Sequence, residues 1–246
     1  MATRFRIFYF LVALIIIGGC GPTPKLNIKP PKEPDKLWEF FEAKYDSINS
    51  LALSGSFVIK GEKTYDTKLQ LVYAFPDSFA FLAEATLGID AARGAIIDGS
   101  GFWEIPREKF SEEITIDDYI MFDGNSIDIG LLLQAMFYFR DLPDYRYINK
   151  RSYKYNYSKA DNKHHKTIEL NGQSATPISI KITENSNMQQ SVYTIDYYDW
   201  RKLGDSMLYP GRITVSSAVS GLTAEYNISK AKINPSLPAS LFKKRH

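Results

Sequence analysis

The chain has 246 residues, with 30 lysines and arginines, 28 aspartates and glutamates, and a single cysteine, Cys20. Two of the basic residues and none of the acidic ones fall in the first 19 positions, so residues 20–246 carry 28 charges of each sign. A nucleic-acid-binding domain usually carries a basic excess, and this balance argues against that class. One cysteine excludes an intramolecular disulfide, so a hydrophobic core must hold the fold together.

The first 20 residues have the organisation of an export signal. Arg4 and Arg6 precede an unbroken apolar run of 11 residues, Ile7 to Ile17. That run is too short to span a bilayer, which takes roughly 20 residues, but it suits a secretory signal peptide. Ile17-Gly18-Gly19-Cys20 resembles the lipobox of bacterial lipoproteins. We therefore expect residues 1–19 to be removed and Cys20 to be acylated. Gly21, in place of the aspartate that retains enterobacterial lipoproteins in the inner membrane, favours the outer membrane facing the periplasm.

Residues 20–34 contain five prolines, which disfavour helix and favour an extended spacer. At roughly 3.1 Å per residue, such a leash reaches about 45 Å from the bilayer. Residues 35–246 are expected to form one domain, with no helix long enough to cross the membrane.

The domain shows two helical patterns among many strand patterns. The first helix is expected from a cap at Asp35 to about Asn49, and the second, apolar on most of its surface, over Ile127–Phe139. The segment Ile114–Met121 is ambiguous. No strand–helix–strand alternation appears, which predicts an α+β fold built on a strongly curved antiparallel sheet. The expected strands are Leu51–Gly61, Tyr65–Phe75, Ser78–Ala85, Arg93–Asp98, Phe102–Ile105, Tyr145–Tyr157, Lys166–Leu170, Ile178–Thr183, Ser191–Trp200, Leu208–Ser217 and Leu222–Lys232.

The sequence offers no convincing catalytic or metal site. His164 and His165 are adjacent, so in a strand they point to opposite faces and cannot easily share one metal. The pairs Glu112-Glu113 and Asp117-Asp118 are expected in loops, as solvated charge rather than acid–base catalysts. Asp123, Asn125 and Asp128 resemble part of a calcium loop, but the required glycine and glutamate are misplaced. No nucleophile motif or phosphate-binding loop occurs, so we expect no enzyme activity, metal or cofactor.

The order of elements resembles the LolA/LolB superfamily of periplasmic lipoprotein carriers, and most closely the LolB-type outer-membrane lipoproteins. The resemblance covers nearly all of residues 20–246, although no single motif is a strict signature. The segments that resemble the family are Leu51–Phe57, Phe79–Leu82 followed by Leu87-Gly88, Gly88–Arg93 with Ile97-Asp98, Ile127–Phe139 followed by Leu142-Pro143, Ile195–Asp199 and Leu208–Ile213.

The resemblance implies an unclosed antiparallel β-barrel whose open side is covered by helices and whose apolar interior takes acyl chains. The expected acyl-chain lining is Phe57, Leu69, Leu71, Phe81, Leu132 and Met136, subject to a strand register that the sequence leaves open. The loop Leu87, Gly88 and Ile89 is expected to touch the membrane, the alternative being that it folds back onto the barrel edge. Thr86, where the family has proline, and a long end from Asn234 to His246 depart from the LolB pattern.

The expected function is a membrane-anchored carrier that binds acyl chains of lipoproteins or lipids and helps to insert them into the outer membrane. The expected partners are the membrane, reached through the Cys20 lipid, the acylated cargo and a soluble LolA-like carrier. The protein is expected to be a monomer. The alternative is a non-catalytic structural or assembly lipoprotein that uses the same fold as a scaffold with a solid core.

Overall fold

The computed structural model describes residues 29–61, 63–75, 78–85, 89–116, 118–122, 125–141, 144–160, 164–185, 190–203, 207–218, 220–238 and 242. They form a strand-rich fold with two α-helices, α2 (Pro34–Ala43) and α3 (Ile129–Met136), and two short 3-10 turns, η2 (Pro106–Glu108) and η3 (Tyr138–Asp141). The strands are β1 (Ser50–Lys60), β2 (Thr64–Ala74), β3 (Ser78–Ala85), β4 (Ile89–Ile97), β5 (Ser100–Ile105), β6 (Phe110–Thr115), β7 (Tyr119–Phe122), β8 (Asn125–Asp128), β9 (Arg146–Arg151), β10 (Lys154–Ala160), β11 (His164–Asn171), β12 (Thr176–Asn185), β13 (Gln190–Tyr198), β14 (Arg201–Leu203), β15 (Met207–Tyr209), β16 (Arg212–Ser217) and β17 (Thr223–Ile233).

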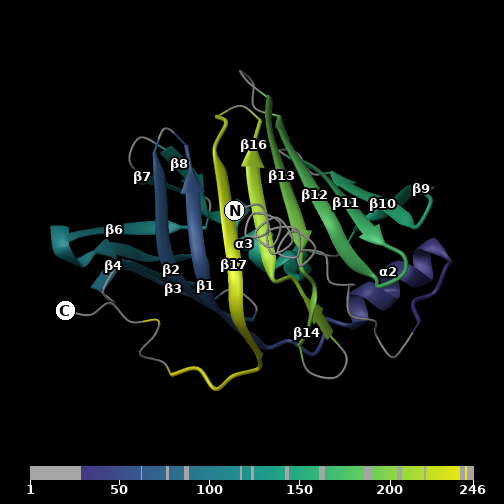
Figure 1. Ribbon diagram of the computed structural model, residues 1–246, viewed down its shortest axis with the longest axis horizontal. Helices are drawn as coiled ribbons and strands as arrows, with labels where there is room; N and C mark the ends of the chain where they lie inside the picture. Colours follow the sequence, from purple (N-terminus) through teal and green to yellow (C-terminus); the bar gives the residue numbers. More distant parts are fainter. Residues whose placement is uncertain are drawn as a thin grey trace, which may run out of the picture.

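Thirteen of these strands form one antiparallel sheet with two free edges. Its order is β6-β5-β4-β3-β2-β1-β17-β16-β13-β12-β11-β10-β9, so β6 and β9 never meet and the barrel stays open. Figure 1 shows the sheet turning from β6 at one end, through β17 in the middle, to β9 at the other end. The first and last strands of the chain pair with each other at its centre, where β1 lies against β17.

One face of the sheet is apolar because side chains alternate along each strand. On β1, Leu51, Leu53, Phe57 and Ile59 are buried, while their neighbours in sequence are mostly less so. Corresponding residues of the other central strands join the same hydrophobic cluster, which also contains the buried side chains of α2 and α3. Both described helices therefore pack on the same face of the sheet. The expected curved, unclosed antiparallel sheet is confirmed.

The first helix is shorter than the sequence analysis predicted. It begins with Pro34 at its first position after Glu33, rather than at a cap on Asp35, and it ends at Ala43 rather than near Asn49. Beyond Ala43 the backbone tightens: Tyr45 bonds back to Glu42, and Ile48 to Tyr45, each three residues away. Tyr45 and Ile48 are buried in these turns.

The second helix is also shorter than predicted. α3 covers Ile129–Met136, while Ile127 belongs to β8 and pairs with Ile120. Phe137 still bonds to Leu133, and the chain then continues as η3. The short strands β7 and β8 form a hairpin just before α3, and the predicted helix had included the last two residues of β8.

Several strand boundaries also differ from the predicted ones. The expected strand Tyr145–Tyr157 is two strands, β9 and β10, turning at Ser152-Tyr153 with Ser152 at a positive φ of 58°. The expected strand Leu208–Ser217 is β15 and β16, separated at Pro210-Gly211. The ambiguous segment Ile114–Met121 contributes to the end of β6 and to β7. Glu112 and Glu113 were expected in a loop but lie on β6, an edge strand of the sheet. The predicted hairpin between β4 and β5 is confirmed, with Asp98 and Gly99 at positive φ.

The described end of the expected leash packs on the domain. Pro30 is buried, and Pro34, expected to be the last spacer residue, is helical. None of the helices that the structure describes is long and apolar enough to cross a bilayer.

Candidate functional site

A cavity of about 450 Å³ lies between α3 and the half of the sheet formed by β1 to β6. Its wall is almost entirely apolar. The lining residues are Phe57, Ile59, Tyr65, Asp66, Thr67, Leu69, Leu71, Phe79, Phe81, Ala83, Ala91, Ala92, Ile96, Trp103, Ile105, Arg107, Glu108, Ile114, Ile129, Leu132, Leu133 and Met136.

Strand register brings the sheet side of the cavity together. Leu71 of β2 lies opposite Phe81 of β3, and Leu69 lies opposite Ala83. Along β1 and β3 the lining residues alternate, because the side chains between them point to the other face, whereas residues 65–67 of β2 and residues 91–92 of β4 line the cavity consecutively. Ala83, Ala91 and Ala92 leave room where larger residues would fill the space.

The other wall comes from one side of α3. Ile129, Leu132, Leu133 and Met136 recur at helical spacing and all line the cavity. Asp66, Arg107 and Glu108 also line it and are exposed, so the cavity reaches solvent beside η2. An apolar interior with a polar mouth suits a ligand with a long hydrocarbon part.

The structure brings all six predicted lining residues, Phe57, Leu69, Leu71, Phe81, Leu132 and Met136, into this one cavity. The sequence analysis missed the contributions of β4 to β6. Phe79 and Ala83 share the alternation of Phe81 and could have been found from it. Trp103 could not, because the inward face of its strand depends on the register, and Ile114 could not, because its segment was ambiguous in the sequence.

The other half of the buried face contains a dense aromatic cluster. Trp38 packs against Tyr145 and Tyr157 at ring-centre distances of 5.1 Å and 4.7 Å. Tyr138 of η3 lies 5.1 Å from Tyr197 and 5.5 Å from Tyr45. Figure 1 places α2 beside this half of the sheet.

Buried phenols tie the aromatic cluster to the cavity wall. The hydroxyls of Tyr45 and Tyr138 are 2.9 Å apart, and Tyr209 donates to the carbonyl of Met136 at 2.5 Å. Tyr226 donates to the carbonyl of Leu69 at 3.0 Å. Burial raises the pKa of all four phenols. They therefore stay neutral at physiological pH and act as hydrogen-bonding struts.

The remaining sequence-predicted sites have different outcomes. Cys20, Leu87 and Gly88 lie outside the described residues, and Ile89 begins β4. His164 and His165 are consecutive on β11, as the argument against a shared metal required. Asp117 and Asp123 lie outside the described residues, and the described part of the chain contains no group of three potential metal ligands.

Comparison with known proteins places this geometry in a structural class. No family model and no curated protein sequence matches the chain. A LolA superfamily protein from Nitrosomonas europaea has a TM-score of 0.60 over 87% of this chain and 99% of its own, at 13% identity. A domain assigned to outer membrane lipoprotein sorting, from Vibrio parahaemolyticus, has a TM-score of 0.63 over 84% and 94%, at 10% identity.

The chain has the fold of the LolA superfamily. A DUF1329 family protein from Desulfovibrio piger shares it, with a TM-score of 0.65 over 88% of this chain and 98% of its own, at 11% identity. The LolA-like fold predicted from the order of elements is therefore confirmed. At these identities the comparisons establish the architecture, and the cavity must be interpreted from its own chemistry.

Proposed function

We propose that this protein is a membrane-anchored carrier in the bacterial envelope that holds an acyl chain in the cavity under α3 and helps to pass acylated cargo to the outer membrane. The observation that carries the proposal is the almost wholly apolar lining of that cavity, with its polar mouth beside η2. Burying each methylene gains about 0.8 kcal/mol, so such a wall can compete with a bilayer for a chain. The LolA-superfamily fold of the chain supports the same reading.

The cavity volume limits the cargo that fits inside. A methylene takes up about as much room as a liquid water, roughly 30 Å³, so 450 Å³ holds about 15 methylenes. That is one acyl chain of ordinary length. We therefore propose that a lipid or lipoprotein with several chains places one of them in the cavity.

A second candidate function is a structural or assembly lipoprotein. The observation in its favour is the aromatic cluster, because Trp38, Tyr138 and Tyr197 fill half of the interior as an ordinary core would. The two functions differ in whether the other half stays empty in solution or receives a ligand.

Filling the cavity tests the carrier proposal. Ala83→Phe adds a ring to the lining, so we expect the affinity for a fluorescent fatty acid to fall by about tenfold or more while the fold persists. Ala52→Phe is the matched control, since Ala52 lies on the same sheet between the inward-facing Leu51 and Leu53 and does not line the cavity. Extraction of the purified wild type for mass spectrometry should show about one bound acyl chain per protein.

The scaffold function is supported instead by the opposite pattern. In that case the wild type carries no lipid and fails to bind the probe, and Ala83→Phe raises the melting temperature by filling an empty space.

A further inference from the structure

The β9–β10 hairpin exposes apolar side chains at one edge of the sheet. Every residue of β9 is exposed. Tyr147, Ile148 and Tyr153 are 40%, 47% and 45% exposed, three of the seven large exposed hydrophobic residues among those described. Their concentration within seven positions distinguishes this edge from the scattered exposed apolar residues of an ordinary surface.

The same hairpin concentrates positive charge. Residues 144–160 contain five lysines and arginines and one acidic residue, Asp144, although residues 20–246 are balanced overall. Lys154 is neutralised by Glu169, whose carboxylate is 2.7 Å from its ammonium. Arg146, Lys150 and Arg151 remain exposed on β9, with the Lys150 ammonium 4.6 Å from the ring of Tyr155.

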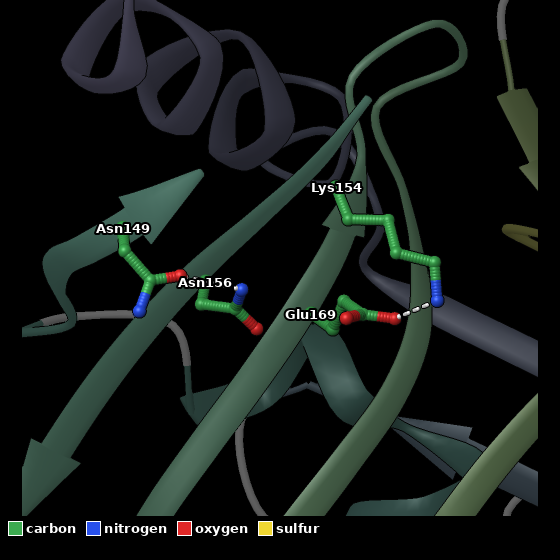
Figure 2. Close-up of polar contacts among 4 residues, drawn as sticks. All are labelled: Asn149, Lys154, Asn156 and Glu169. Carbon is green, nitrogen blue, oxygen red and sulfur yellow. Dashed lines mark hydrogen bonds and ion pairs between the residues drawn. The ribbon is translucent and has the colours of Figure 1, made fainter. Parts of the chain in front are cut away.

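Contacts on both faces hold the hairpin in place. On one face Asn156 donates to Asn149 at 3.0 Å, beside the pair of Lys154 and Glu169 (Figure 2). On the other face the ring of Tyr147 meets that of the buried Tyr157 at 5.9 Å. Charges on an edge strand also discourage pairing between molecules, but that purpose does not explain three apolar side chains displayed beside them.

The N-terminal segment reaches the domain at this same edge. Tyr155 and Tyr157 of β10 donate to the carbonyls of Lys32 and Pro34, at 2.8 Å and 2.7 Å. Only 11 residues separate Lys32 from Cys20, a reach of roughly 35 Å when extended. If Cys20 carries the lipid proposed above, the tether holds this edge closest to the bilayer.

We propose that the β9–β10 hairpin is a docking surface for anionic lipid headgroups. Exposed lysines and arginines attract anionic headgroups, and tyrosines favour the boundary between water and hydrocarbon. The surface would bring the tethered domain to the membrane with β9 facing the headgroups. Of these arguments, only the tether geometry rests on the proposed function.

Vesicle binding by the chain from Gly21 onward tests this surface without the lipid anchor. This chain contains the whole core cluster, which runs from Leu37 to Ile228. We expect it to sediment with phosphatidylcholine vesicles containing about a third phosphatidylglycerol, to release as salt screens the charges, and to ignore pure phosphatidylcholine. The combined variant Arg146→Glu, Lys150→Glu and Arg151→Glu should bind at least about a hundredfold more weakly, since each of the three charges contributes roughly fivefold.

The matched control makes the same charge change elsewhere. Lys60→Glu, Lys181→Glu and Lys232→Glu alter exposed residues on three other strands and should leave binding within about twofold. Equal losses in the two variants, or wild-type binding that does not depend on phosphatidylglycerol, would overturn the proposal. A wild-type protein that is a dimer in solution, and a β9 variant that is a monomer, would also overturn the proposal, because the edge would then be an interface between two copies. A cavity that fails to bind the fatty-acid probe leaves this test unaffected.

Discussion

At the scale of single residues, Gly55 shows how closely the central strands approach each other. The register between β1 and β17 shifts between Ser54 and Gly55, forming a bulge. A Cβ on Gly55 would lie 1.9 Å from the carbonyl oxygen of Asn227, a backbone atom that cannot move aside cheaply. Gly55 is thus required by a backbone contact between the first and last strands of the sheet.

Cys20 carries the single-residue prediction. Acylation requires its thiol, so Cys20→Ser should abolish labelling by a clickable fatty acid and move the protein from the membrane fraction to the soluble fraction. Labelling in cells followed by fractionation measures both effects. If the serine variant still takes the label and still sediments with membranes, the protein is not anchored through this residue. The matched control adds Ser47→Cys to the Cys20→Ser variant: it supplies a thiol in the turn after α2, outside the lipobox, and should not restore labelling.

At the scale of elements, the connection between β3 and β4 differs from the β9–β10 edge in its place in the sheet. β3 ends at Ala85 and β4 begins at Ile89. These strands are fourth and third in the sheet order counted from β6, whereas β9 forms the opposite edge. The predicted membrane-contact loop and the proposed headgroup surface therefore belong to different halves of the sheet. They would act differently, one by inserting an apolar side chain and the other by attracting charge.

The loop prediction is tested by Leu87→Glu. A leucine that leaves water for an apolar layer gains roughly 1.5–3 kcal/mol, and a glutamate loses this gain. We expect the variant to keep its melting temperature and its binding of the fatty-acid probe, but to lose insertion into vesicles, measured by quenching of a fluorophore on the loop with brominated lipids.

Ile97→Glu is the control, because Ile97 is 42% exposed at the other end of β4. It should insert like the wild type. A melting temperature lowered by several degrees in Leu87→Glu alone would show that the loop folds back onto the domain.

At the scale of the whole molecule, the two halves of the buried face have different consequences. The half under α3 encloses the cavity, and the half beside α2 is filled by aromatic residues. Burial raises the pKa of the Tyr45, Tyr138, Tyr197, Tyr209 and Tyr226 phenols. The Tyr197 hydroxyl has no hydrogen-bond partner within the described part of the chain, so its ionised form would be especially costly.

These phenols predict loss of stability at high pH. Because their pKa values are higher in the folded protein than in the unfolded chain, their contribution is complete below pH 10 and falls as the pH rises above it. Above pH 10, each buried phenol lowers the free energy of unfolding by up to about 1.4 kcal/mol per pH unit. Urea unfolding between about pH 8 and pH 11.5 should show this fall, accompanied by a cooperative rise in tyrosinate absorbance.

Lys44 has the opposite effect on the pH dependence of stability, but it is a single group against five phenols. Burial lowers the pKa of its ammonium to about 8, although the ammonium donates to the carbonyls of Ser174 and Ala175. Folding therefore releases a proton between about pH 8 and the ordinary lysine pKa, and stability rises slightly with pH there. Five phenols outweigh one lysine above pH 10, so a free energy of unfolding that stays flat to pH 11.5 would contradict the buried-tyrosine cluster.

The sequence by itself determined the class of fold, and its resemblance to the LolA/LolB superfamily named six residues that line the cavity, Phe57, Leu69, Leu71, Phe81, Leu132 and Met136. Two-residue alternation and helical spacing group residues that share a face, but the strand register decided which face points inward. These patterns are local, so they survive errors in the boundaries of the elements. The signal peptide and the acylation of Cys20 also rest on local sequence alone, and they stay predictions.

Only the tertiary structure decided where the interior is filled and where it is hollow. Leucine and aromatic residues supply apolar volume to both halves of the sheet, and no local pattern says how that volume is distributed. Strand order places Ala83 and the lining residues of β4 and β5 around the cavity. Trp38 of α2 packs in the other half, against Tyr157. A local turn at Ser152 divides Tyr145–Tyr157 into β9 and β10. The basic, aromatic surface of that hairpin stays exposed because β9 ends the strand order of the sheet among the described residues.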